Sequence, residues 1–89
     1  MARKETVTKI IDGDTFETAS RKNPVRLANV DTPEKGQRGF AKATETLRKM
    51  IEGKEVRIET VGHDKYGRAV ARAHQGPESI NKKMKKQIK

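Results

Sequence analysis

The amino-acid sequence predicts a mainly β domain, with five short strands, one inserted helix and a second helix at the end of the chain. Three observations lead to this prediction. Five segments are rich in β-branched or alternating apolar residues. Turn signals containing Gly, Asp, Asn or Pro separate these segments. One segment between the third and fourth strands has its apolar residues at helical spacing instead. The order is compatible with a small closed barrel, and the local pattern would equally suit an open α+β sheet.

The first three strands follow one another directly. Residues 6–11 are rich in β-branched residues, and the Asp-Gly-Asp turn at 12–14 connects them to a second strand over 15–19 in a hairpin. After another turn, residues 25–30 form the third strand. Pro33 marks the end of this segment, because proline cannot continue a strand ladder.

A helix is expected after the third strand, since apolar residues recur there every three or four positions. They are Phe40, Ala43, Leu47, Met50 and Ile51. Gly53 is a good stop signal. Two more strands follow over 55–61 and 69–74, with the loop 62–67 between them. Alanines alternate along one face of the last strand, which suggests close packing there.

The C-terminal segment is strongly basic. Residues 80–89 carry five lysines and no acid, in a chain of net charge +9. Ile80, Met84 and Ile88 recur every four residues, and Pro77 suits the first turn of a helix. We therefore expect a short helix from about residue 77, which frays after Met84 because its lysines repel one another.

Length and composition restrict the class of protein. We expect one domain over 1–89, with a barrel over about 5–76 and the basic helix or tail over about 77–89. Leu, Ile, Val and Phe make up only 16 of the 89 residues, so the core is small and a partly folded chain is an alternative. The absence of cysteine excludes disulfides and thiolate chemistry.

The charge and the absence of long apolar runs indicate partner and location. No apolar run approaches ~18 residues, so no membrane span is expected. The basic balance favours nucleic acid as the partner, with an anionic membrane surface second. No signal peptide follows the first methionine. The chain as written is expected in the cytoplasm, whereas a mature or trimmed form would be extracytoplasmic.

Acidic residues gather at two of the predicted turns. Asp12 and Asp14 lie in the first hairpin, and Asp31 and Glu34 follow the third strand. Hard divalent cations bind carboxylate and carbonyl oxygens. If the two turns converge, these acids and the carbonyl of Thr32 could hold Ca²⁺ or Mg²⁺. The alternative is that each acid only stabilises its own turn.

Two further features concern phosphate binding. Arg26 lies inside an otherwise apolar strand, where it either points into water or reaches the acidic cluster and a phosphate on it. The loop Asp64-Lys65-Tyr66-Gly67-Arg68 combines cations with a tyrosine that could contact a base or a phosphate. It could equally be an ordinary hairpin loop. Together, metal-binding acids, arginines and a basic surface are what phosphodiester cleavage needs.

The sequence resembles the staphylococcal nuclease family, or thermonucleases, in three motifs with matching order and rough spacing. They are Ile11-Asp12-Gly13-Asp14-Thr15-Phe16, the segment from Val25-Arg26-Leu27 through Val30-Asp31-Thr32-Pro33-Glu34, and Asp64-Lys65-Tyr66-Gly67-Arg68. The likeness covers residues 7 to about 84. It implies an OB-fold, a five-stranded barrel with a helix after the third strand. It also implies Ca²⁺-dependent hydrolysis of DNA and RNA at the 5′ P–O bond, which leaves 3′-phosphates.

The resemblance also implies roles for individual residues. Carboxylates of Asp14 and Asp31 and the carbonyl of Thr32 would bind Ca²⁺, with Asp12 behind them. Glu34 would act on the attacking water. The remaining positions would contact the substrate: Arg26 and Arg68 at the scissile phosphate, and Lys65 and Tyr66 at a neighbouring phosphate or base. Single-stranded DNA or RNA is the expected partner, and the chain is expected to be a monomeric endonuclease.

The chain departs from the family pattern at its end. Members usually continue through a further helix, whereas here Lys82 to Lys89 replace the expected apolar continuation. We expect this difference to affect stability more than chemistry. The alternative function is a non-catalytic OB-fold module that binds single-stranded nucleic acid through a basic groove. Dependence on metal separates the two readings, because binding alone should persist in a chelator.

Overall fold

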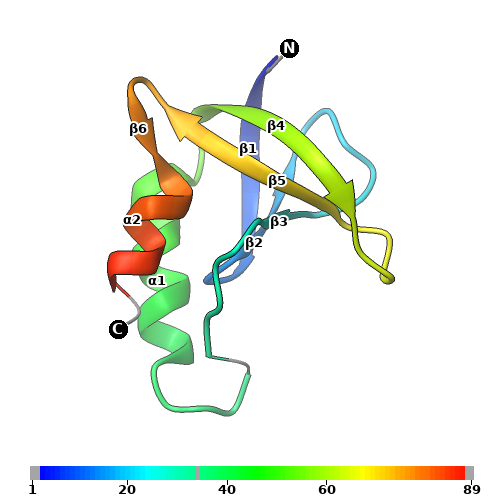
Figure 1. Ribbon diagram of the computed structural model, residues 1–89. Helices are drawn as coiled ribbons and strands as arrows, with labels where there is room; N and C mark the ends of the chain where they lie inside the picture. Colours follow the sequence, from blue (N-terminus) through cyan, green and yellow to red (C-terminus); the bar gives the residue numbers. More distant parts are fainter. Residues whose placement is uncertain (1–2, 34, 88–89) are drawn as a thin grey trace.

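The fold was taken from a computed structural model, which describes residues 3–33 and 35–87 (Figure 1). Its elements in chain order are β1 (Arg3–Asp12), β2 (Thr15–Thr18), β3 (Val25–Leu27), α1 (Phe40–Ile51), β4 (Glu55–His63), β5 (Ala69–Gln75), β6 (Glu78–Ser79) and α2 (Ile80–Gln87). The predicted helix after the third strand has the bounds expected from its apolar spacing and from Gly53.

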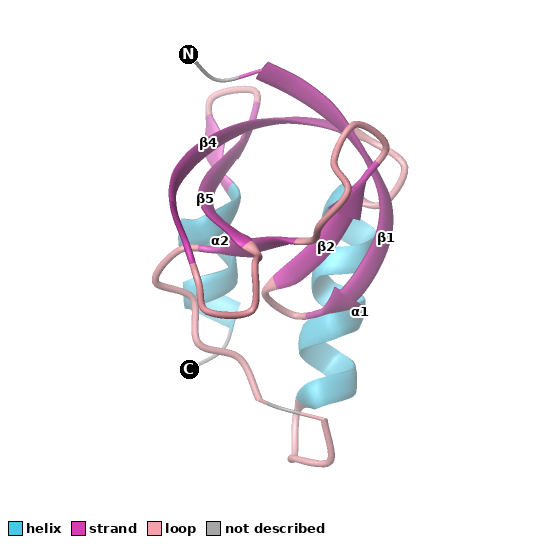
Figure 2. Ribbon diagram, turned by 90° about the vertical axis from the view of Figure 1, so that its right-hand side faces the viewer, coloured by secondary structure: helices cyan, strands magenta, loops and turns pink. Residues whose placement is uncertain are grey.

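The strands form one sheet that closes on itself. Their order is β3-β2-β1-β4-β5-β6, with antiparallel neighbours, and β3 also pairs with β5 in parallel. This last pairing joins five strands into a ring, which Figure 2 shows with both helices to one side of it. The predicted mainly β barrel is therefore confirmed, and the open α+β sheet is excluded.

Apolar side chains from the ring and both helices form one core. Its fully or nearly fully buried members are Val7, Ile10, Phe16, Val25, Leu27, Val30, Leu47, Ile51, Val56, Ile58, Ala71, Ala73, Ile80 and Met84. The alternation of buried and exposed residues along β4 and β5 supplies several of them. The few aliphatic residues of the chain are thus concentrated in the core of the barrel.

The third strand is shorter than the sequence predicts. It ends at Leu27, not at residue 30, because Asn29 adopts a left-handed backbone with φ 60° and turns the chain. Asparagine tolerates this conformation better than most residues. The turn still leaves Val30 buried in the core, and it directs the following residues toward the β1–β2 hairpin.

The C-terminal helix also differs from its prediction at both ends. It begins at Ile80 and not near Pro77, because Glu78 and Ser79 pair with β5 as the short strand β6. The prediction that it frays after Met84 is wrong, since α2 continues to Gln87. Ile80 and Met84 are both fully buried, so packing on the barrel outweighs lysine repulsion. Ile88, the third apolar residue of this pattern, lies outside the described residues.

Candidate active site

The β1–β2 turn presents two aspartates and is packed tightly against its surroundings. The backbone N–H of Asp14 donates to Oδ1 of Asp12 at 3.0 Å. A Cβ atom on Gly13 would lie 2.8 Å from Cβ of Ala43 and 2.9 Å from Cγ2 of Thr32. Only glycine therefore fits here without a shift, and the turn is held directly against Thr32.

Asp14 is a buried carboxyl group whose environment disfavours its charge. Its residue is 8% exposed, and the Thr15 hydroxyl donates to its Oδ1 at 2.8 Å. Burial, together with the neighbouring Asp12, raises the pKa of Asp14 to about 6, although Thr15 and Arg26 act in the opposite direction. A cation bound beside this carboxylate would favour its charged form.

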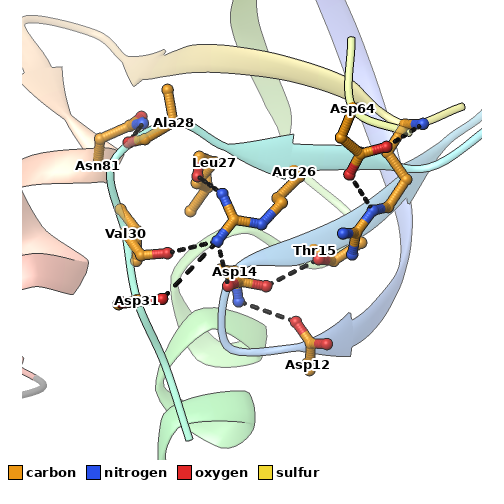
Figure 3. Close-up of polar contacts among 11 residues, drawn as sticks. Asp12, Asp14, Thr15, Arg26, Leu27, Ala28, Val30, Asp31, Asp64 and Asn81 are labelled. Carbon is orange, nitrogen blue, oxygen red and sulfur yellow. Dashed lines mark hydrogen bonds and ion pairs between the residues drawn. The ribbon is translucent and has the colours of Figure 1, made fainter. Parts of the chain in front are cut away.

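Arg26 reaches the acidic cluster from the middle of β3 (Figure 3). Its Nη2 lies 3.4 Å from Oδ2 of Asp14 and 4.0 Å from Oδ1 of Asp31. Two backbone carbonyls fix the guanidinium group, because Nη1 donates to Leu27 O and Nη2 to Val30 O, each at 3.2 Å. The side chain is 25% exposed, so the alternative in which Arg26 points into water is wrong.

Residues after β3 complete a small cavity. Its volume is about 190 Å³, and it is lined by Asp12, Asp14, Arg26, Asp31, Thr32, Pro33 and Arg68. Six of the nine predicted site residues therefore meet at one place. Of the other three, Lys65 and Tyr66 lie in the β4–β5 loop beside Arg68, and Glu34 lies outside the described residues.

The oxygen atoms around this cavity suit a hard cation in their chemistry. The carboxylates of Asp14 and Asp31 approach the same nitrogen of Arg26, and Thr32 also lines the cavity. The Asp31 side chain is fully exposed, so it is accessible to an ion from solution. Within residues 3–33 and 35–87, no group of three or more acidic or histidine side chains is close enough to form a metal site by itself.

The β4–β5 loop is organised by Asp64. Its Oδ1 accepts the backbone N–H groups of Tyr66 at 3.0 Å and Arg68 at 2.9 Å, and its Oδ2 accepts Nε of Arg68 at 2.6 Å. Gly67 supplies the left-handed turn, with φ 82°. No separate role of Asp64 is predicted from the sequence, although its place four residues before Arg68, with Gly67 between them, is the available signal.

Tyr66 is the exposed aromatic residue beside this cavity. It is 71% exposed, and its ring centre lies 5.3 Å from Nζ of Lys65 and 5.3 Å from Cζ of Arg68. An exposed ring flanked by two cations can stack on a base while the cations attract phosphate. The loop thus places two cations beside one exposed aromatic ring.

Comparison with known proteins agrees with this geometry. The model of the family described as staphylococcal nuclease homologue matches residues 24–87. The chain belongs to the staphylococcal nuclease family. Arg26, Asp31, Thr32 and Arg68 lie within the matched segment of this nuclease family, whereas the β1–β2 turn with Asp14 precedes it.

Several relatives of this family carry nuclease names. An uncharacterized endonuclease of Haemophilus influenzae is 39% identical over 84 residues, which cover 91% of this chain and 47% of the relative. An uncharacterized endonuclease of Escherichia coli is 32% identical over 77 residues, 84% of this chain and 50% of the relative. The micrococcal nuclease of Shigella flexneri is 35% identical over 66 residues, 72% of this chain and 38% of the relative. The chain thus spans about half the length of the curated relatives it matches, or less.

Neither helix in the described part of the chain is long and apolar enough to cross a membrane.

Proposed function

We propose that this chain is a Ca²⁺-dependent nuclease that hydrolyses phosphodiester bonds of DNA and RNA at the 5′ P–O bond and leaves 3′-phosphates. The observation that carries the proposal is the position of Arg26, which is fixed by two backbone carbonyls between the carboxylates of Asp14 and Asp31. Arg68 faces the same cavity. A phosphate that entered it would meet two guanidinium groups and the carboxylates of Asp12, Asp14 and Asp31.

The two arginines would bind the scissile phosphate and stabilise the charge that develops on it. Nε of Arg68 donates a hydrogen bond to Asp64. Among the described contacts, the two terminal nitrogens of Arg68 stay available to donate to phosphate oxygens. Arg26 is held before substrate arrives, so little reorganisation is needed during the reaction. Arginine suits this work because its planar fork can donate two parallel hydrogen bonds.

Asp14, Asp31 and the carbonyl of Thr32 would hold the calcium ion. Asp12 would support them indirectly, since its carboxylate accepts the N–H of Asp14 and fixes the turn. When bound, the ion supplies Lewis-acid polarisation of the phosphate. A site with so few charged ligands is expected to be weak, with a dissociation constant of roughly 10⁻⁴–10⁻³ M.

Glu34 would position or deprotonate the attacking water. This role comes from the family resemblance, as Glu34 lies outside the described residues. Exchanging its carboxylate for an amide removes the proton acceptor and keeps nearly the same shape. Glu34→Gln should therefore lose most cleavage and still bind DNA.

The proposal is tested by cleavage of single-stranded DNA in millimolar Ca²⁺, with a chelator control and the Glu34→Gln variant beside the wild type. We expect cutting by the wild type that the chelator abolishes and that the variant lacks. A terminal phosphatase should act on the new 3′ ends, because they carry phosphate. Cutting that continues in chelator would refute the metal dependence. A variant that cuts at the wild-type rate would refute the role of Glu34.

A second candidate function is binding of single-stranded nucleic acid without cleavage. The exposed ring of Tyr66 between Lys65 and Arg68 favours it, since such a platform binds bases irrespective of sequence. The same assay separates the two functions. A folded protein that binds oligonucleotides in chelator and cuts none of them in Ca²⁺ would be a binding module.

A further inference from the structure

We propose that Lys85, on helix α2, forms a second phosphate-binding position, which receives the nucleic-acid strand as it leaves the catalytic cavity. The inference rests on the proposed function for the identity of the ligand, an extended single strand of DNA or RNA. It assigns a task to the basic C-terminal helix, whose lysines the proposed cleavage reaction does not use.

A second cavity adjoins the catalytic one. It has a volume of about 430 Å³ and is lined by Arg26, Asn29, Val30, Asp31 and Lys85. Arg26 and Asp31 belong to the walls of both cavities. A strand whose phosphate lies at Arg26 can therefore continue into the larger cavity without leaving the protein surface.

The wall of this second cavity is positively charged overall. Its wall carries a guanidinium and an ammonium group against a single carboxylate, so an anion is favoured there. Lys83, on the same helix, forms an ion pair with Glu78. Lys85 makes no ion pair with any residue of the described chain, so its ammonium group is available to a phosphate. Arg26 is already paired with Asp14, which leaves Lys85 as the additional cation.

Lys85 lies on a helix that is firmly attached to the barrel. Its neighbour Met84 is fully buried in the core. Nδ2 of Asn81 donates to Ala28 O at 2.9 Å (Figure 3), and Oδ1 of Asn81 accepts the N–H of Ala73 at 2.9 Å. These contacts attach α2 both to β5 and to the segment that carries Asp31. The position of Lys85 relative to the cavity is therefore set by the folded barrel.

Asn29 adds a neutral hydrogen-bonding group to the same wall. Its left-handed backbone turns the chain directly after β3, and its residue is exposed. A side-chain amide can donate to a phosphate oxygen or pair with the polar edge of a base. The cavity thus offers charge for the backbone of the strand and an amide for a nucleotide that follows.

The arrangement of the elements gives the strand a direction across the molecule. Figure 1 shows α2 and the β4–β5 loop on opposite sides of the barrel. Figure 3 places Arg26 between Asn81 of α2 and Asp64 of that loop. A bound strand would therefore run from Lys65 and Tyr66, over the two arginines, to Lys85.

The inference is tested by equilibrium binding of a fluorescein-labelled oligothymidylate in chelator, at several salt concentrations, with Lys85→Gln and Lys82→Gln compared. Lys82 lies on the same helix, is exposed and does not line the cavity, so it is the matched control for loss of one charge. Loss of one phosphate contact on a single strand reduces the salt slope by about 0.7. This corresponds to binding that is about 5-fold weaker at 0.1 M salt and about 2-fold weaker at 0.3 M.

The expected result is this loss in Lys85→Gln alone, with binding restored in Lys85→Arg. Equal losses in Lys85→Gln and Lys82→Gln would show general attraction by the basic helix and would overturn the inference. An unchanged salt slope in Lys85→Gln would overturn it as well. Far-UV circular dichroism is expected to be unchanged, because the exposed Lys85 side chain makes no hydrogen bond or ion pair with the described residues.

Failure of the proposed function is detected separately, with a nitrophenyl ester of a single nucleotide in Ca²⁺. This substrate reports cleavage in the catalytic cavity without a strand that continues beyond it. If the wild type does not cleave it or DNA, the nuclease proposal fails, while a slope change specific to Lys85 still supports the binding position.

Discussion

Asn81 connects the C-terminal helix to the strand that carries the candidate site, and its removal gives the sharpest test of the fold. The residue is 8% exposed, and its amide makes three hydrogen bonds. Nδ2 donates to Ala28 O at 2.9 Å and to Ala71 O at 3.2 Å, and Oδ1 accepts the Ala73 N–H at 2.9 Å. Asn81→Leu keeps the same branching and number of side-chain heavy atoms and removes all three bonds.

The expected loss follows from the groups left without a partner. Ala71 O retains the N–H of Ala28 at 2.8 Å, whereas Ala28 O and the Ala73 N–H lose the partner described for each. A buried polar group without a partner costs roughly 1–3 kcal/mol. Asn81→Leu should therefore lower the free energy of unfolding by about 2–6 kcal/mol. A domain of this size has a total of roughly 4–13 kcal/mol, so the loss is a large share.

Urea unfolding followed by far-UV circular dichroism measures this change, since the chain has no tryptophan and Tyr66 is exposed. With a slope near 1 kcal/mol per molar urea, the midpoint should fall by about 2 M or more. Ser79→Ala is the control, at the residue directly before the same helix. It removes a cap, because Ser79 Oγ accepts the N–H of Lys82, and should cost about 1 kcal/mol.

Asn81→Asp distinguishes lost hydrogen bonds from altered packing. Its carboxylate keeps an acceptor for Ala73 and places negative charge against Ala28 O, whereas its protonated form can donate there again. The pKa of this carboxyl group should be raised by the fold, so the variant should gain stability as the pH falls below 7. Loss of less than 0.5 kcal/mol in Asn81→Leu, or no recovery of Asn81→Asp in acid, would refute the reasoning.

Three further predictions concern charge, chemistry and packing. The hydrogen bond from Arg21 lowers the pKa of the buried Glu5, against the effect of burial, so the pair stabilises the fold above pH 4.5 and this contribution is lost as the pH falls through the lower folded-state pKa. Glu5→Gln should make the free energy of unfolding depend less on pH in acid, and an unchanged pH dependence would contradict this. Arg26→Lys should slow DNA cleavage by about 10²–10³-fold in single-turnover assays, since an ammonium cannot replace the bidentate fork; a loss under 3-fold would count against that role. Gly13→Ala should cost about 1–3 kcal/mol in urea unfolding, because its Cβ would overlap Thr32, and a neutral effect would show that the turn can shift.

The elements predicted best are those whose signal is local and repeated. The bounds of α1 agree with the sequence because an amphipathic run ends at a glycine, and Gly53 has a φ of 79° that glycine adopts easily. The end of β3 was missed because one residue, Asn29, leaves the extended region within a run of apolar residues. Strand β6 has two residues and exists through its pairing with β5, so no local pattern announces it.

The candidate site shows the same division. Residue types made the acids and arginines candidates for one site only if their turns converge, since each acid could equally have stabilised its own turn, and the family resemblance supplied their roles. Their arrangement was not available from local pattern, since Arg26 meets Arg68 through the pairing of β3 with β5. The amide of Asn81 and the ammonium of Lys85 were also invisible, because their partners are distant in sequence.

The parallel pairing of β3 with β5 also sets the order in which activity should appear during folding. The β1–β2 and β4–β5 hairpins join strands that are adjacent in the chain, whereas the β3–β5 pair encloses α1 and β4 and closes a much longer loop. Long-range pairings of this kind are slow, since their loop-closure entropy must be overcome first. Arg26 lies in β3 and Arg68 directly precedes β5. Secondary structure should therefore return early in refolding, and cleavage only with the slowest phase, when the ring closes.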